Sequence, residues 1–160
     1  MKRSILIAVT ATLALAPAAQ AATGAGYLLK HQRRSGGIAE AGTRKASVSL
    51  TEWAAMGLRA AGASCAGRSV AHAYDYLTTV QTSSHGYALL PAGAANSQST
   101  SWAVQARHRC GLRNRRALAW LHARQLPSGA YNYQPGLTTT PAWVTGQVLP
   151  AVNGRAYPIT

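Results

Sequence analysis

Few side chains in this chain could do acid–base or nucleophilic chemistry, and they are scattered. The carboxylates are Glu40, Glu52 and Asp75, against 16 lysines and arginines. The 5 histidines lie far apart, from His31 to His122. General acid–base catalysis needs a carboxyl or imidazole group beside a partner that tunes its pKa. Because so few acids are present, the composition argues against an enzyme.

Two groups of residues have the right types for catalysis or metal binding but the wrong arrangement. Ser84 and His85 supply a hydroxyl and an imidazole, yet no acid is placed to orient the histidine as in a Ser-His-Asp triad. Cys65, His72 and Asp75 are residue types that bind zinc, but no pair has the standard ligand spacing. We therefore predict no catalytic residue, no metal and no cofactor.

The basic residues are densest in one segment of the chain. The segment contains Arg107, Arg109, Arg113, Arg115 and Arg116. With nearby aromatic residues, these side chains could bind the phosphates of an anionic envelope polymer and, by the same electrostatics, nucleic acid. The simpler interpretation is a solvated basic face, and we do not expect nucleic acid as a partner.

The start of the chain has the pattern of a secretory signal peptide. Two basic residues precede an apolar run at 5–15, and residues 19–21 form a small-x-small cleavage site. We predict a signal peptide at 1–21, one domain at 22–160 and a secreted, extracytoplasmic location. No later apolar stretch reaches the roughly 20 residues of a transmembrane anchor. Removing the two basic residues lowers the formal charge from +13 to +11, which still favours anionic partners.

An exported chain can hold a disulfide, and this one has 2 cysteines. Cys65 and Cys110 each follow a helix led by a tryptophan, so adjacent helix ends could bring them together. A bond between them would stabilise the fold by roughly 3 to 4 kcal/mol. The alternative is a pair of buried thiols that serve as small core residues.

The elements that would position these residues follow a repeating pattern. A Gln-x-x-Ser-Gly turn occurs as Gln32, Ser35 and Gly36 and again as Gln125, Ser128 and Gly129. A glycine there permits the positive φ that ends a helix. An offset of 49 carries Trp53 to Trp102, and an offset of 90 carries Trp53 to Trp143. The recurrence predicts an array of repeats in which Trp-led helices alternate with Gln-ended ones.

Apolar periodicity predicts that most of the chain is helical. Helices are expected to end near Gln32, Gly62, Val80, Gly111 and Gln125, and a last one to begin at Pro141. Residues 87–90 could start another short helix. Ser49 and Glu52 have the spacing of a capping box ahead of the helix that holds Trp53. We predict an all-α array of about six to seven helices in two layers.

These motifs resemble the prenyltransferase and squalene-oxidase repeats of secreted bacterial proteins. The resemblance rests on the two Gln turns, the T-x-W-A segments at 51–54 and 100–103, and the ending T-P-A-W-V-T-G-Q-V-L-P-A, and it covers nearly all of residues 26–158. That family belongs to the terpenoid cyclase and protein prenyltransferase superfamily, whose fold is an α/α toroid. The resemblance implies a partial toroid-like array. It also implies that the glutamine of each turn ties one hairpin to the next, although serine stands where the family usually has aspartate.

The resemblance also implies two enzymatic activities, and the chain lacks the residues for both. Class II terpenoid cyclases protonate an alkene with an aspartic acid in a D-x-D-D motif, whereas Asp75 lies between two tyrosines without companion carboxylates. Protein prenyltransferases hold zinc through Asp, Cys and His, which here lack ligand spacing. A terpenoid cyclase or prenyltransferase-like enzyme acting on an isoprenoid substrate is therefore the alternative.

The favoured function is a non-catalytic, exported binding or interaction module. A complete ring of this superfamily takes more hairpins than this chain provides, so a concave apolar face would stay open. Such a face would bind a hydrophobic or isoprenoid-like ligand, or be covered by a second copy in a homodimer or by another protein. A basic cell-envelope polyanion binder is the second alternative.

Overall fold

The computed structural model describes residues 16–157, with side chains from residue 24 onward. Its helices are α1 (Ala16–His31), α2 (Val48–Ala60), α3 (Arg68–Thr79), α4 (Ser97–His108), α5 (Arg115–His122) and α6 (Pro141–Val152). Between them the described backbone has turns and isolated antiparallel bridges, which confirms the all-α class. The predicted signal peptide at 1–21 lies mostly outside the described residues. No helix in the described part combines the length and apolar character of a membrane span.

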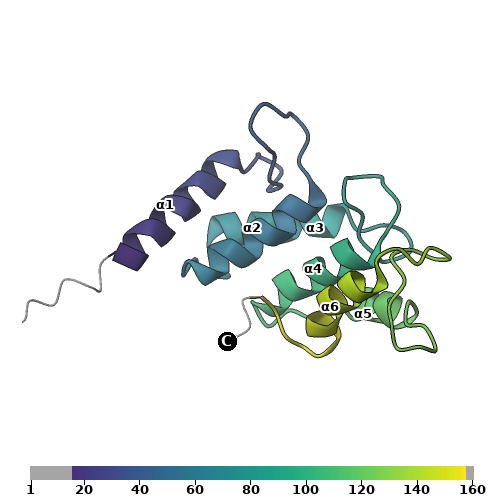
Figure 1. Cartoon of the computed structure of the whole chain (residues 1–160). Helices are drawn as coiled ribbons and strands as arrows, with labels where there is room; N and C mark the ends of the chain where they lie inside the picture. The colour runs from purple at the N-terminus through teal and green to yellow at the C-terminus, as the bar shows by residue number, and fades with distance from the viewer. Residues whose placement is uncertain (1–15, 158–160) are drawn as a thin grey trace, which may run out of the picture.

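The chain order divides the described helices into three consecutive pairs, α1–α2, α3–α4 and α5–α6, each joined by a turn and called a hairpin below (Figure 1). Helix α4 packs between α2 and α6, while α3 packs against α2 and α5 packs against both α4 and α6. Helix α1 lies at one end of the array and packs against α2. The core between them is apolar and includes Met56, Leu58, Val70, Leu77, Tyr87, Leu121, Val144 and Val148. Even-numbered helices therefore neighbour one another, with α3 and α5 packed alongside them.

The start of α2 differs from the predicted capping box. Ser47 is the N-cap, and its hydroxyl accepts a hydrogen bond from the Leu50 amide at 3.3 Å. Ser49 and Glu52 therefore lie inside the helix, where both are buried. The capping-box prediction is wrong because the helix begins two residues earlier than the spacing suggested. The short helix predicted at 87–90 is also wrong, because Tyr87 pairs as extended backbone with Asn96.

The same turn occurs three times, once more than the sequence predicted. In each copy a glutamine side chain donates to the backbone carbonyl four residues on, from Gln32 to Gly36 at 3.0 Å, from Gln81 to His85 at 2.7 Å and from Gln125 to Gly129 at 3.4 Å. The accepting residue has a positive φ in every copy, 90°, 70° and 86° in turn. In the middle copy, His85 rather than glycine adopts this backbone conformation.

A threonine locks each turn to the helix that follows it. The backbone amides of Ile38, Tyr87 and Tyr131 donate to the hydroxyls of Thr51, Thr100 and Thr145 at 2.8, 2.9 and 2.9 Å. Trp53 and Trp102 each come two residues after this threonine, and the equivalent residue after Thr145 is Gln147. The third copy has one extra residue between its turn and its threonine. Trp143 is therefore not the structural counterpart of the other two tryptophans.

The first two turns are each covered by an aromatic ring of the next hairpin. A Cβ added to Gly37 would lie 2.8 Å from the Tyr76 ring, and one added to Gly86 would lie 2.9 Å from the Trp120 ring. Gln32 also donates to the backbone carbonyl of Ser69 at 2.7 Å, which ties the first turn to α3. The third turn has Ala130 at the glycine position, so the packing that joins the first two turns to their neighbours is not repeated there.

Candidate ligand-binding groove

Aromatic side chains from three neighbouring helices gather around one solvent-open groove. Trp53 of α2, Trp102 of α4 and Trp143 of α6 line it, together with Tyr157 from the segment after α6. The groove has a volume of about 530 Å³. Trp53 is 44% exposed and Trp143 is 62% exposed, which is unusual for the largest apolar side chain. An exposed aromatic cluster of this kind marks a binding surface.

The rings are set at defined angles around Trp53. Its ring meets the Trp102 ring edge-on at a centroid distance of 5.3 Å, and it lies within 17° of parallel to the Tyr157 ring at 6.4 Å. Two long-range bonds hold the Tyr157 backbone: its amide donates to the Gln105 side chain at 3.2 Å, and its carbonyl accepts from Arg109 at 3.1 Å. The C-terminal segment is thus fixed as one wall of the groove.

Small residues make the space between these rings. Gly146 and Ala142 line the groove beside Trp143, and a Cβ added to Gly146 would contact nothing within 4 Å. A second hollow of about 360 Å³, lined by Gly57 and Ala60 among others, shares Trp53 and Tyr157 with the groove. An elongated apolar molecule could therefore follow α2 past the Trp53 ring.

Two polar atoms at the groove have no partner within the protein. The indole Nε1 of Trp102 and the amide Oε1 of Gln147 are buried, and neither makes a hydrogen bond with any described residue. Buried polar groups are nearly always paired, so two in one lining are unusual. They supply one donor and one acceptor. Among the described residues, no charged side chain lines the groove, so the chemistry of this lining is aromatic with a small, neutral polar component.

Glu52 is a buried acid whose role the sequence did not indicate. It is fully buried on α2, and neither carboxylate oxygen has a full hydrogen bond. Burial raises the pKa of Glu52 well above its usual value, and the nearby Ser49 hydroxyl opposes this only in part. Position 52 lies one helical turn from Val48, on the buried side of α2, so helical periodicity could have placed it in the core.

The buried acid makes stability depend on pH. Because the folded-state pKa of Glu52 is raised, the folded protein holds this proton more tightly than the unfolded chain, and stability falls as pH rises above about 4.3 toward the folded-state pKa. We expect Glu52→Gln to remove this loss and to be the more stable protein at pH 8. Urea denaturation at pH 4, 6 and 8 measures the effect. Glu40→Gln is the control, because Glu40 is exposed; equal pH profiles for wild type and Glu52→Gln would contradict the prediction.

Cys65, His72 and Asp75, whose side chains are of types that bind zinc, do not form a metal site in the described part of the chain. Cys65 is bonded to Cys110, which removes its thiolate as a ligand, and Asp75 is exposed on α3. Among residues 24–157, no three His, Cys, Asp or Glu side chains gather closely enough to hold a metal ion. Ser84 and His85 lie exposed in the middle turn. None of these residues lines the aromatic groove.

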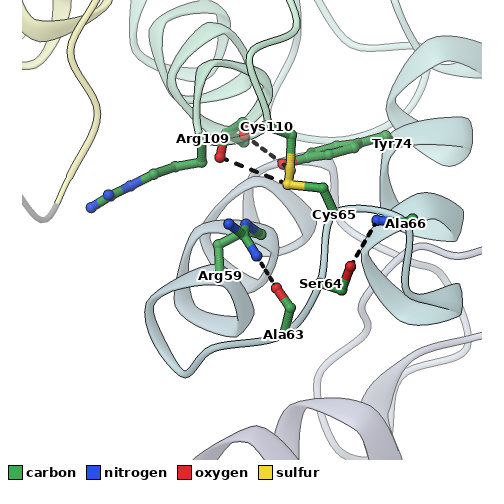
Figure 2. Close-up of a disulfide and its surroundings, with 9 residues drawn as sticks. Arg59, Ala63, Ser64, Cys65, Ala66, Tyr74, Arg109 and Cys110 are labelled. Carbon is green, nitrogen blue, oxygen red and sulfur yellow. Dashed lines mark hydrogen bonds between the residues drawn. A yellow bond between two sulfur atoms is a disulfide. The ribbon is translucent and has the colours of Figure 1, made fainter.

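The predicted disulfide is confirmed. Cys65, in the loop between α2 and α3, is bonded to Cys110, which follows α4, with their Cα atoms 5.7 Å apart. Figure 2 shows the Tyr74 ring beside the sulfur atoms. The Tyr74 hydroxyl donates to the backbone carbonyl of Ala106 at 2.6 Å and lies 3.3 Å from the Cys110 sulfur. The bond therefore joins the end of the first hairpin to the end of α4.

The arginines predicted as an anion-binding cluster are divided between two roles. Arg107 donates to the Thr78 hydroxyl at 2.6 Å, and Arg109 donates to the Tyr157 carbonyl at 3.1 Å, so both tie α4 to other parts of the fold. The remaining three, Arg113, Arg115 and Arg116, are exposed between α4 and the first turn of α5. The structure thus leaves three of the five directed to solvent.

The aromatic groove and its uncharged lining therefore point to a hydrophobic ligand. Glu52, the one buried carboxyl among the described residues, is not part of that lining. Compared with the models of known families the chain matches none, and it matches no curated protein.

Proposed function

We propose that this protein is an exported, non-catalytic binding module that takes a hydrophobic, isoprenoid-like ligand in the groove between α2, α4 and α6. The observation that carries the proposal is the set of four aromatic side chains around an open groove of about 530 Å³. Their exposure is costly in water and would be relieved by a ligand, because each buried aromatic side chain is worth about 1.5 to 3 kcal/mol. The disulfide fits an extracytoplasmic location.

The packing of the helices supports a fold related to the α/α toroids. Helix α4 packs between α2 and α6, with α3 and α5 packed alongside them. We infer that this is a partial toroid of the terpenoid cyclase and prenyltransferase repeat superfamily. In such an array the face of α2, α4 and α6 would line the interior of the ring, and the exposed tryptophans lie on these helices.

An isoprenoid-converting enzyme is the less favoured alternative. Class II cyclisation would need a carboxylic acid beside the substrate, and no carboxylate lines the groove. Burial raises the pKa of Glu52, but Glu52 is not among the residues that line the groove, and Asp75 is exposed on α3. Turnover of squalene or a prenyl diphosphate by the purified protein, lost on Asp75→Asn or Glu52→Gln, would favour the enzyme over the binding module.

We expect the uncharged isoprenoid alcohol farnesol to bind the groove and to change the tryptophan fluorescence. Its chain would cover the exposed rings of Trp53 and Trp143. The double variant Trp53→Ala/Trp143→Ala should weaken binding at least tenfold, because two buried aromatic contacts are lost. Trp53 is 44% exposed and Trp143 is 62% exposed, so neither is a core residue and the fold should survive.

The matched control is Leu90→Ala, which removes an equally exposed apolar side chain outside the groove. Its affinity for farnesol should equal that of the wild type, measured by displacement of a fluorescent fatty probe. If farnesol and squalene both fail to bind, or if the double variant binds as the wild type does, the proposal is wrong. Binding of a prenyl diphosphate in preference to farnesol would contradict the uncharged character of the site.

A further inference from the structure

A third hollow, separate from the aromatic groove and from the hollow at Gly57, lies where the first turn meets α3. It has a volume of about 680 Å³. Its polar lining consists of Gln32, Arg33, Arg34, Arg68, Ser69 and His72. These residues come from the first turn, directly after α1, and from the beginning of α3. Three guanidinium groups, an imidazole and a hydroxyl thus surround one hollow.

The walls of this hollow are held in place by contacts that do not use up its charges. Gln32 donates to the Ser69 carbonyl at 2.7 Å, and Gly36 packs so closely on His72 that an added Cβ would overlap its carbonyl oxygen. Arg33 donates to the Thr43 carbonyl. The first turn and α3, which carry the cations, are therefore joined by a hydrogen bond and by close packing.

The positive charge of the hollow is uncompensated. No carboxylate lines it. Arg34 and Arg68 are exposed, and neither side chain takes part in a hydrogen bond or ion pair with another described residue. Helix α3 begins at Arg68, and its N-cap, Gly67, offers no side chain to the first-turn amides. The positive end of the helix dipole therefore adds to the field of the arginines.

We propose that this hollow, the Arg34–Arg68 pocket, binds a phosphate-bearing anion that carries at least two negative charges. Arginine pairs phosphate oxygens through two parallel N–H groups, and several arginines around one hollow match a group with several oxygens. The His72 imidazole and the Ser69 hydroxyl can donate further hydrogen bonds. The pocket is independent of the aromatic groove and shares no residue with it. Its ligand could be a free phosphate ester or the headgroup of an anionic lipid, which share this chemistry.

The test uses inorganic pyrophosphate as the probe and isothermal titration calorimetry at low salt as the measurement. We expect Arg34→Gln/Arg68→Gln to weaken pyrophosphate binding at least tenfold. The control is Arg113→Gln/Arg116→Gln, which removes the same two charges from an exposed site elsewhere, and it should change the affinity less than twofold. Equal loss in both variants would show general attraction to a basic protein, and an unchanged affinity in the first would place the site elsewhere. Either result, or no binding of pyrophosphate, overturns the proposal.

Two further measurements locate the site and identify the source of the phosphate. Amide resonances of Ser69 and His72 should shift on addition of pyrophosphate in the wild type and not in Arg34→Gln/Arg68→Gln; shifts confined to α5 would overturn the assignment. Vesicles containing phosphatidylglycerol are then added. Release of vesicle-bound protein by pyrophosphate supports the site as a lipid headgroup site, whereas pyrophosphate binding without vesicle binding supports it as a site for a free phosphate ester. Farnesol affinity should stay unchanged in the double variant, so either proposal can fail alone.

Discussion

Gly36→Ala is expected to destabilise this protein by about 2 to 5 kcal/mol, from backbone strain and overpacking together. Gly36 has a φ of 90°, which a residue with a side chain adopts only at a cost. A Cβ at this position would lie 1.9 Å from the backbone oxygen of His72, far inside van der Waals contact. Because the obstacle is the backbone of α3, the turn would have to lift off that helix. The Gln32 bond to Ser69 would then be lost as well.

Gly129→Ala provides the matched control within the same chain. Gly129 occupies the equivalent position in the third turn with a φ of 86°, but an added Cβ would meet nothing within 4 Å. We expect only the conformational cost, about 1 to 2 kcal/mol. Urea denaturation of both variants separates strain from overlap. Equal losses in the two variants would show that the packing of Gly36 against α3 contributes nothing measurable.

Loss of the disulfide is expected to cost about 4 kcal/mol, because the bond closes a long loop in the unfolded chain. Cys65 and Cys110 are 45 residues apart in sequence. For a domain of this size, such a loss is a large share of a total stability of about 5 to 15 kcal/mol. The double variant Cys65→Ser/Cys110→Ser should unfold at a much lower urea concentration than the oxidised wild type.

Reductant gives the control for this prediction. The wild type should lose stability on addition of reductant, whereas the stability of the double serine variant should not change. In reductant, the two proteins should then unfold at similar urea concentrations. The prediction would be contradicted if the unfolding midpoint of the wild type did not change in reductant although a thiol assay showed complete reduction. The geometry of the aromatic groove is also expected to be disturbed, because Arg109, next to Cys110, donates a hydrogen bond to the Tyr157 carbonyl.

Sequence reasoning found the parts of the fold that depend on local signals. Apolar periodicity predicted the helices, and the position of each cysteine after a helix led to the disulfide. The turns at Gln32 and Gln125 were visible because glycine marks a positive φ. The sequence also showed a loop beginning with glutamine at Gln81 to Gly86, but it was not grouped with the other two turns because His85 takes the place of glycine. The offset of 49 from Gln32 to Gln81 would have grouped it.

The groove was harder to predict because its members are brought together by tertiary structure. An offset of 90 grouped Trp143 with the other tryptophans, but the hydrogen bond of Thr145 shows that the third copy has gained a residue. Tyr157 enters the groove because its amide bonds to Gln105, 52 residues away in sequence. Glu52 was assigned to a cap because its spacing from Ser49 fits one, and local spacing does not report on burial by neighbouring helices.

The alanine in the third turn limits how this protein could be lengthened by duplication. In the first two turns, glycine leaves room for a ring from the following hairpin, at Gly37 for Tyr76 and at Gly86 for Trp120. A hairpin engineered after α6 would bring its own aromatic ring against the Cβ of Ala130. The graft should therefore require Ala130→Gly before it can join the core, which makes this one methyl group a barrier to modular extension.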